Sequence, residues 1–163
     1  MPTNDAIGDR GESIFQVHIT NYTPGGDPLF RPVVLGAKYP TLDFFVELLG
    51  LPAGRVAYFF AQVKATGRGY TKKPPVRLKV GVSQADIDRM LTYPGPTYVI
   101  GIDQQPGQEQ AFIASVNGPA MGRIQGLPTT YPLNSANLQT LWDEVESYWR
   151  HNGAALNNSA FTL

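Results

Sequence analysis

Two polar residues interrupt the apolar run VAYFFAQVKAT at positions 56–66. Gln62 and Lys64 stand two positions apart in this run, whose β-branched and aromatic residues predict a strand. Because side chains alternate between the two faces of a strand, Gln62 and Lys64 point to the same face. Asp43 opens the preceding apolar run, and a turn at 51–54 makes the two runs a predicted hairpin. This hairpin can bring Asp43 beside Gln62 and Lys64.

Side chains of these types suit the hydrolysis of a phosphodiester with the help of a bound metal ion. A hard cation such as Mg²⁺ or Mn²⁺ takes oxygen ligands, which Asp43 and Gln62 can supply. The attacking water and the charged transition state also need a positive charge nearby, which Lys64 carries. Glu12, in a predicted helix beside the sheet, can reach the same place. The four residues together therefore indicate one metal-dependent site.

Each of these residues also has a simpler explanation when it is taken alone. Asp43 belongs to a residue type that is common in the turn before a strand. Gln62 and Lys64 fit the solvent face of an edge strand, where lysine blocks pairing with another chain. Glu12 fits an exposed position on a helix. Glu47 faces the same side as Asp43 and is either a second acidic ligand or the partner of a basic residue in an ion pair.

The rest of the chain predicts an α/β layered domain with a mixed sheet flanked by helices. This follows from the order of the elements, in which strands and helices alternate. The predicted elements are a helix at 5–20, a short strand at 33–36, strands at 43–49, 56–66 and 76–82, a helix from Ser83 to about 91, strands at 97–102 and 111–116, and a helix from 134 or 135 to about 151. Segments 21–32, 67–75 and 118–132 are predicted loops.

The first and last helices each show a face that predicts burial. In the first helix, Gly8, Gly11 or Glu12, Phe15 and Ile19 share one face at three- and four-residue spacing. Each glycine lowers the helix propensity by roughly 1 kcal/mol relative to alanine, so we expect another backbone to approach this face closely. The last helix has an apolar stripe of Leu138, Leu141, Trp142, Val145, Tyr148 and Trp149. This stripe is predicted to be core, with any remaining aromatic surface serving as a partner-binding face.

Length and composition fit one globular domain. The chain has 163 residues, of which 42% are hydrophobic and 16% charged, and we expect a domain at 1–152 and a frayed tail at 153–163. It has no cysteine, which excludes disulfides and thiolate metal sites and fits a cytoplasmic location. No apolar run reaches the roughly 18 residues that a membrane span requires, so no membrane partner is expected.

The charges are unevenly distributed although they sum to zero. Residues 55–89 carry two acids and eight bases, the bases being Arg55, Lys64, Arg68, Lys72, Lys73, Arg77, Lys79 and Arg89. On charge alone, a solvated loop and strand face explains this stretch best. The alternative is that the stretch attracts phosphates. The two histidines, His18 and His151, have no partner at ligand spacing and are expected to be structural or exposed.

The motifs resemble, in their order and context, those of the PD-(D/E)xK or restriction-endonuclease-like nuclease superfamily. The matching pieces are Gly11-Glu12 on the first helix, Pro40-Thr-Leu-Asp43 before an apolar strand, and Gln62-Val-Lys64 on the next strand. The strand at 96–103 further resembles a less characterised bacterial family whose members often occur in anti-phage and restriction contexts. The resemblance covers about residues 5–150.

The resemblance implies a restriction-endonuclease-like core and a role for each residue. Asp43 would be the central metal ligand, and Gln62 would ligate through its amide oxygen where the superfamily usually has Asp or Glu. Glu12 and the backbone carbonyl of Val63 would complete the ligands of Mg²⁺ or Mn²⁺. Lys64 would orient the water and stabilise the charge that develops on the phosphate. The basic residues expected to bind nucleic acid beside this site are Arg68, Lys72, Lys73 and Lys79.

The function that this resemblance implies is that of an endonuclease that hydrolyses DNA. Its expected context is anti-phage defence or restriction, with control by a regulatory partner protein or by assembly into a homo-oligomer. Two alternatives stay open. One is a nuclease-fold module with little activity that binds nucleic acid or a partner protein, which the uncharged Gln62 favours. The other is an RNA endonuclease on the same fold.

Overall fold

The computed structural model describes residues 2–118, 122–153 and 160. The helices in this part are α1 (Asn4–Ile19), α2 (Gln84–Met90) and α3 (Ser135–Asn152). The strands are β1 (Phe30–Val34), β2 (Phe44–Leu48), β3 (Tyr58–Thr66), β4 (Arg77–Leu78), β5 (Thr97–Asp103), β6 (Gln110–Ser115) and β7 (Leu127–Pro128). The predicted tail at 153–163 lies, apart from residues 153 and 160, outside the described residues. None of the described helices is long and apolar enough to cross a membrane.

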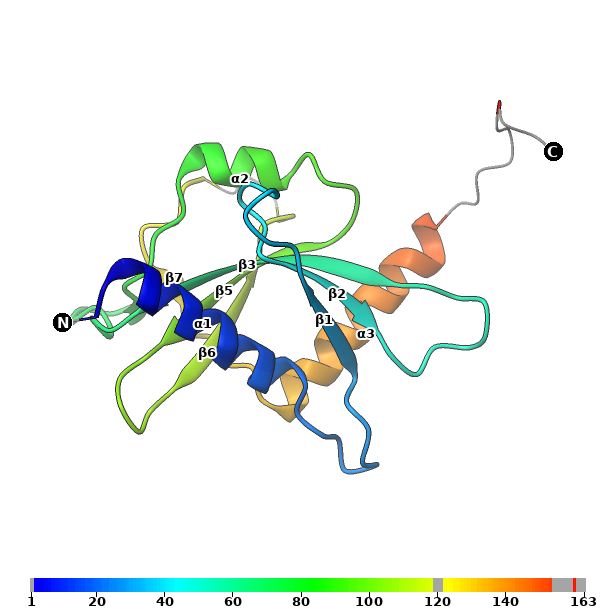
Figure 1. Cartoon of the computed structure of the whole chain (residues 1–163), viewed down its shortest axis with the longest axis horizontal. Coiled ribbons are helices and arrows are strands. Elements are labelled where there is room, and N and C mark those ends of the chain that lie inside the picture. The colour runs from blue at the N-terminus through cyan, green and yellow to red at the C-terminus, as the bar shows by residue number, and fades with distance from the viewer. Residues whose placement is uncertain (1, 119–121, 154–159, 161–163) are drawn as a thin grey trace.

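Five strands form a mixed sheet in the order β1-β2-β3-β5-β6, and this confirms the predicted α/β class (Figure 1). β1 pairs antiparallel with β2, and β2 pairs antiparallel with β3. β3 and β5 are parallel, and β5 and β6 are antiparallel. The parallel pair requires a crossover, and α2 lies within it. The predicted hairpin between the second and third strands is likewise confirmed.

Helices cover both faces of the sheet. α1 and α3 lie on one face, where Phe15 of α1 and Leu141 of α3 belong to the same buried cluster. α2 lies on the other face together with the small β4–β7 sheet, and Ile87, Met90 and Leu127 are fully buried there. In Figure 1, α2 is above the sheet and α1 and α3 are below it. The layered architecture therefore contains two apolar clusters separated by the sheet.

The predicted helix starts are confirmed in detail. Ser83 is the N-cap of α2, and its hydroxyl accepts a hydrogen bond from the backbone N–H of Asp86 at 3.1 Å. The same hydroxyl donates to the Asp86 carboxylate at 2.9 Å, so Asp86 takes the place of the usual glutamate of a capping box. Asn134 caps α3 by accepting from the N–H of Asn137 at 2.9 Å.

Two strand predictions are wrong. The first strand begins at Phe30 and not at 33, and Pro32 lies inside it. β1 is an edge strand that pairs with β2 alone, which is where a proline without an N–H is tolerated. The predicted strand at 76–82 is reduced to β4, because the Val80 N–H donates to the Leu78 carbonyl at 2.8 Å and turns the chain. β4 then pairs with β7, a strand within the segment predicted to be a loop.

The two glycines of α1 have different roles. Gly11 is buried, and a Cβ at this position would lie only 2.5 Å from the Cβ of Ala65 on β3. The predicted close approach is therefore confirmed at Gly11. Gly8 is exposed with open space around it, so its predicted place on the buried face is wrong.

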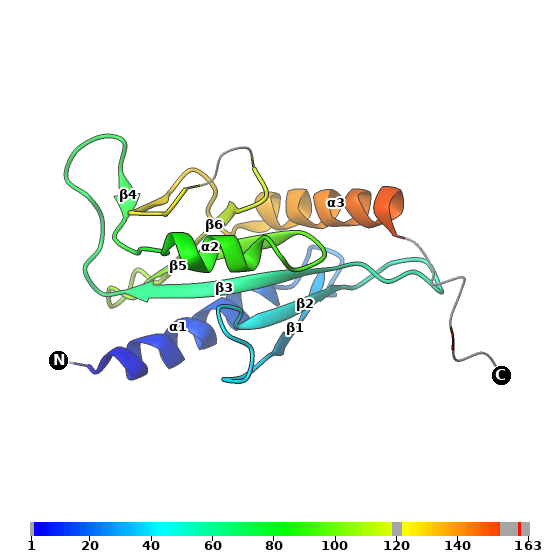
Figure 2. The same ribbon diagram turned by 90° about the horizontal axis from the view of Figure 1, so that it is seen from above.

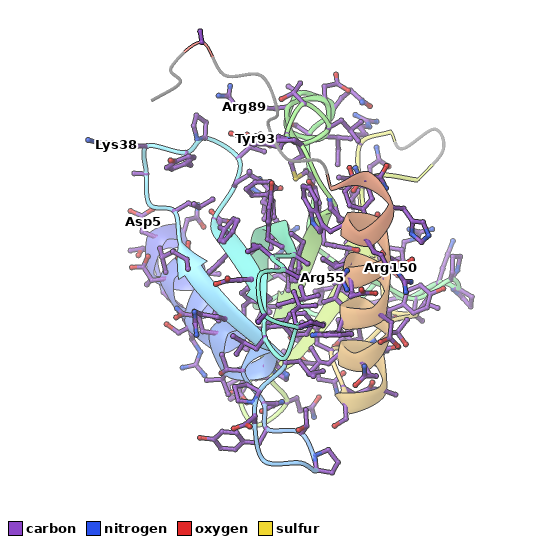
Figure 3. All side chains as sticks on the ribbon, turned by 90° about the vertical axis from the view of Figure 1, so that its right-hand side faces the viewer. Asp5, Lys38, Arg55, Arg89, Tyr93 and Arg150 are labelled. Atoms are coloured by element: carbon purple, nitrogen blue, oxygen red, sulfur yellow. The ribbon has the colours of Figure 1, made fainter. Side chains whose placement is uncertain are left out.

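The aromatic stripe of α3 fixes this helix to the β2–β3 hairpin. The indole N–H groups of Trp142 and Trp149 donate to the backbone carbonyls of Leu49 and Tyr58 at 2.8 and 2.7 Å. Figure 3 shows Arg55 of the same hairpin beside α3, where it pairs with Glu146 at 2.7 Å. Both indoles are half-buried, so they serve packing as predicted.

Candidate metal centre

The start of β2 places Asp43 beside residues 61–63 of β3. Phe44 pairs with Ala61, and the Asp43 N–H also donates to the Ala61 carbonyl at 3.0 Å, one residue out of the register of the two strands. The Asp43 carboxylate then accepts a hydrogen bond from the backbone N–H of Val63 at 2.6 Å. Asp43 is therefore held against β3 just before β2 begins, at the point beyond which β3 pairs only with β5.

A strained turn at Thr41 positions Asp43 beside β3. Thr41 has φ +76°, the only described residue other than glycine with a positive φ. This conformation costs an L-residue roughly 1–2 kcal/mol. Its hydroxyl donates to the Asp86 carboxylate of α2 at 3.1 Å, and the next side chain, Leu42, is buried under α2. These two contacts hold the strained turn directly before Asp43.

Glu12 lies close enough to Asp43 for the charge of Asp43 to raise the pKa of the Glu12 carboxyl. The tight contact of Gly11 with Ala65 seats this part of α1 on β3, and Glu12 is the next residue. Partial burial raises the pKa of the Glu12 carboxyl, and the negative charges of Asp43 and Asp9 raise it further. Two carboxylates thus share one poorly solvated region, which favours a bound cation.

Lys64 offsets part of this negative charge. Burial raises the pKa of Asp43, whereas the hydrogen bond from Val63 and the positive charge of Lys64 oppose that rise. Lys64 is half-buried and shares its face of β3 with Gln62. Its positive charge therefore acts on the carboxylate that the Val63 N–H holds.

Gln62 carries an oxygen that has no partner. Its side chain is only 3% exposed, and its Oε1 atom accepts no hydrogen bond from the described residues. A buried amide oxygen without a donor costs on the order of 1–3 kcal/mol, so native structures rarely leave one. A cation bound between Gln62 and Asp43 would satisfy this oxygen. The residues present therefore fit a hard divalent cation.

The backbone of Val63 completes the candidate set of ligands. Its N–H points to the Asp43 side of β3, and in an extended strand the carbonyl of the same residue points to that side too. The candidate ligands do not share one face of β3, because Gln62 and Lys64 point to the α2 face whereas Glu12 comes from α1 on the other face. Asp43 is the residue whose charge reaches both Glu12 and Lys64. No group of three or more Asp, Glu, His or Cys side chains able to hold a metal occurs among the described residues.

Other candidates from the sequence lie elsewhere. Glu47 pairs with Arg31 across β1 and β2 at 3.4 Å, which agrees with the ion-pair alternative. His18 is half-buried near the end of α1, and His151 is exposed near the end of α3 with a ring nitrogen 2.7 Å from the Ser147 carbonyl. None of these side chains adds a ligand to the candidate metal centre.

Three of the four basic residues predicted to bind nucleic acid lie together in the loop that follows β3. Arg68, Lys72 and Lys73 are exposed, and the loop begins at Gly67, three residues beyond Lys64. Figure 2 shows the loop rising from the carboxyl end of β3 before it returns to β4. Lys79 is half-buried, and its backbone N–H donates to the Gly69 carbonyl at 2.9 Å.

Sequence reasoning missed Asp103, which shares the face of Gln62 and Lys64. Asp103 is 0% exposed, lies next to Thr66 in the register of β3 and β5, and its Oδ2 has no hydrogen-bond partner in the described chain. Burial and the neighbouring Asp103 carboxylate raise the pKa of the Tyr70 hydroxyl to about 12. A charged residue that ends an apolar strand was the available signal.

Comparisons of the chain with models of protein families, with curated proteins and with solved structures found no match.

Proposed function

We propose that this protein is a metal-dependent endonuclease of the PD-(D/E)xK type that hydrolyses phosphodiester bonds of DNA. The observation that carries the proposal is the unpartnered Gln62 oxygen, buried on the same face of β3 as Lys64 and one residue before the Val63 N–H that holds Asp43. Asp43, whose carboxyl has a raised pKa, lies at the same stretch of β3, and its charge acts on both Glu12 and Lys64. Carboxyl groups with perturbed pKa values beside a positive charge are typical of functional sites, and here they favour binding of a cation and a phosphate.

Each residue has a distinct task in the proposed reaction. Asp43, Glu12, Gln62 and the Val63 carbonyl would hold Mg²⁺ or Mn²⁺, and the ion would supply an activated water and a Lewis acid for the phosphate. The Val63 N–H fixes one oxygen of Asp43, which limits the rotation of this carboxylate. Lys64 stabilises the negative charge that develops on the phosphate oxygens in the transition state.

The architecture and the charge distribution support a nucleic acid as the substrate. The mixed sheet with helices on both faces agrees with the layered core that the resemblance implies. The exposed basic loop after β3 begins next to the candidate metal centre, where it can bind the phosphates that flank a scissile bond. A role in anti-phage defence or restriction, a cytoplasmic location and control by a partner protein or a homo-oligomer follow from the resemblance alone.

A second candidate function is a nuclease-fold module that binds nucleic acid or a partner protein with little hydrolysis. The neutral amide of Gln62 favours this candidate, because a carboxylate binds a hard dication more strongly than an amide does. An RNA endonuclease would use the same residues in the same way.

A cleavage assay on supercoiled plasmid and on single-stranded RNA, with and without Mg²⁺, tests the proposal and separates these candidates. We expect Mg²⁺-dependent cleavage of the plasmid by the wild-type protein and none by the Lys64→Ala variant. Cleavage of the RNA alone would change the substrate class. If a folded protein cleaves neither substrate and binds both equally well with and without Mg²⁺, the binding module is the correct alternative.

A further inference from the structure

A cavity of about 620 Å³ opens beside β6, away from the candidate metal centre on β2 and β3. It lies between α3, the β5–β6 edge of the sheet and the segment 122–131. Its floor is apolar, since Ile113, Ile124 and Leu141 line it and are buried. Its volume falls in the range of roughly 300–1,000 Å³ that is usual for small-molecule sites.

Two arginines stand at one wall of this cavity. Arg77 and Arg123 both line it, and both are exposed. The Arg77 guanidinium donates to the Gly126 carbonyl at 3.1 Å, and Arg123 donates from Nε to the amide oxygen of Gln125 at 3.0 Å when that amide is correctly oriented. Neither guanidinium forms an ion pair with a carboxylate of the described residues. Two fixed positive charges without a counterion favour an anionic ligand.

The wall formed by α3 and β5 offers hydrogen-bond acceptors. The Tyr98 hydroxyl donates to one oxygen of Glu144, and both residues line the cavity. Burial and this carboxylate raise the pKa of Tyr98 far above its ordinary value, so the tyrosine stays a neutral donor. The Nδ2 group of Asn137 donates to the Pro132 carbonyl at 2.7 Å, which leaves its amide oxygen as an acceptor. A ligand that carries hydroxyl or amino donors would match this wall.

We propose that this cavity is a second binding site, whose ligand is a nucleotide-sized organic phosphate. The phosphate would bind Arg77 and Arg123, an apolar or aromatic body would cover Ile113, Ile124 and Leu141, and hydroxyl or amino groups would donate to Glu144. A planar guanidinium group can donate two parallel hydrogen bonds to two oxygens of one phosphate. Inorganic phosphate leaves the apolar floor uncovered, so an organic phosphate should bind more tightly. The inference does not depend on the proposed function.

Calorimetric titration of the full chain with AMP, UMP, glucose 6-phosphate and inorganic phosphate tests this site. A chelator in the buffer removes divalent cations, so that phosphate binding through the candidate metal centre is suppressed. We expect at least one organic phosphate to bind at millimolar concentration or below, and to bind more tightly than inorganic phosphate. Arg77→Gln and Arg123→Gln should each weaken its binding about tenfold, the usual loss for a hydrogen bond to a charged group.

Three further variants make the test specific. Thr140→Trp places a large side chain at the mouth of the cavity from an exposed position of α3 and should abolish binding while the protein stays folded. Arg89→Gln makes the same charge change on α2, at the position labelled in Figure 3, and should leave binding unchanged. The proposal is overturned if none of the organic phosphates binds, if inorganic phosphate binds as tightly, or if binding survives the Arg77→Gln/Arg123→Gln double variant. Loss of binding in Lys64→Ala would assign the ligand to the candidate metal centre and would also overturn it.

Discussion

Gln62 is the residue on which the candidate metal centre depends most. Its amide oxygen is buried without a partner among the described residues, and it is neutral where a hard cation favours a carboxylate. The Gln62→Glu variant should therefore bind Mg²⁺ or Mn²⁺ more tightly, by about tenfold or more, because it adds a negative charge at the ion. Calorimetric titration with Mn²⁺ measures this change.

The same variant should be less stable than the wild type without metal, since it buries a carboxylate at a position that is only 3% exposed. Added Mg²⁺ should restore its melting temperature. Gln108→Glu, at an exposed loop position, is the matched control and should change neither quantity. Weaker Mn²⁺ binding by Gln62→Glu than by the wild type would show that Gln62 is not a ligand.

Lys64 is predicted to act on the reaction and hardly at all on stability. Its side chain is half-buried at the end of the paired region, and it forms no ion pair with a described residue. Lys64→Ala should lower the cleavage rate by about 10²–10³, as expected for one lost electrostatic group, and change the free energy of unfolding by less than about 1 kcal/mol. Lys64→Arg keeps the positive charge and should retain more activity. Equal rates for wild type and Lys64→Ala would remove Lys64 from the site.

Glu12 links the site to the pH dependence of stability. The fold raises the pKa of Glu12, so the protonated carboxyl is favoured in the folded state. Its contribution to stability is fully present below the ordinary pKa of 4.5 and is lost as the pH rises through the raised pKa. Without metal, Glu12→Gln should therefore stabilise the protein at neutral pH by up to about 1 kcal/mol, allowing for solvent screening, and not at pH 4. Asp5→Asn, in the first turn of the same helix, should instead destabilise it slightly. Urea unfolding at both pH values checks these signs.

At the scale of the elements, the contact between α1 and β3 positions Glu12. A Cβ at Gly11 would lie 2.5 Å from the Cβ of Ala65, a distance that backbone movement must relieve. Gly11→Ala should therefore destabilise the protein by about 1–3 kcal/mol in spite of the higher helix propensity of alanine. Gly8→Ala, in open space on the same helix, should stabilise it by roughly 0.5–1 kcal/mol. Similar changes in the two variants, measured by thermal unfolding, would contradict the close packing.

The elements show which parts of the fold the sequence can predict. Strong periodicity and caps predicted α1, α3, α2 with its Ser83 cap, and the hairpin of β2 and β3. The alternation from Leu78 to Val82 correctly indicated burial. The strand nevertheless ends at Leu78, because the hydrogen bond from the Val80 N–H to the Leu78 carbonyl closes a three-residue turn there. β7 was missed because only two residues form it, and they pair with a segment some fifty residues earlier in the chain.

The sequence likewise predicted some features of the candidate site and not others. The two-residue spacing of Gln62 and Lys64 was enough to place them on one face, and the hairpin brought Asp43 to them. Nothing local indicated the positive φ of Thr41, because its strained turn is held by Asp86, forty-five residues later in the chain. The burial of Asp103 was equally hidden, since it depends on the parallel neighbour β3.

For the whole molecule, the uneven charge distribution predicts how nucleic acid is held. Lys72 and Lys73 lie exposed in the loop after β3, and neither forms an ion pair with a described residue. If they contact phosphates, Lys72→Gln/Lys73→Gln should weaken DNA binding for every sequence and reduce the slope of log K against log salt by about 2.

The control for this charge effect is Arg55→Gln/Arg150→Gln, which removes the same net charge beside α3. Both arginines pair with Glu146 and lie on the α3 side of the molecule (Figure 3). This variant should leave the salt dependence of DNA binding close to that of the wild type. An equal fall of the slope in both double variants would mean that net charge, and not the loop, governs binding.

The central claim is that Asp43, Gln62 and Glu12 hold a divalent cation. Crystals grown with Mn²⁺ and measured for anomalous scattering test it most directly, because the ion is located without any assumption about activity. We predict one strong anomalous peak within coordination distance of the Asp43 carboxylate and the Gln62 Oε1 atom, roughly 2.0–2.5 Å from each. A peak only at other residues, or none beside a well-ordered Asp43 and Gln62 at saturating Mn²⁺, would contradict the account.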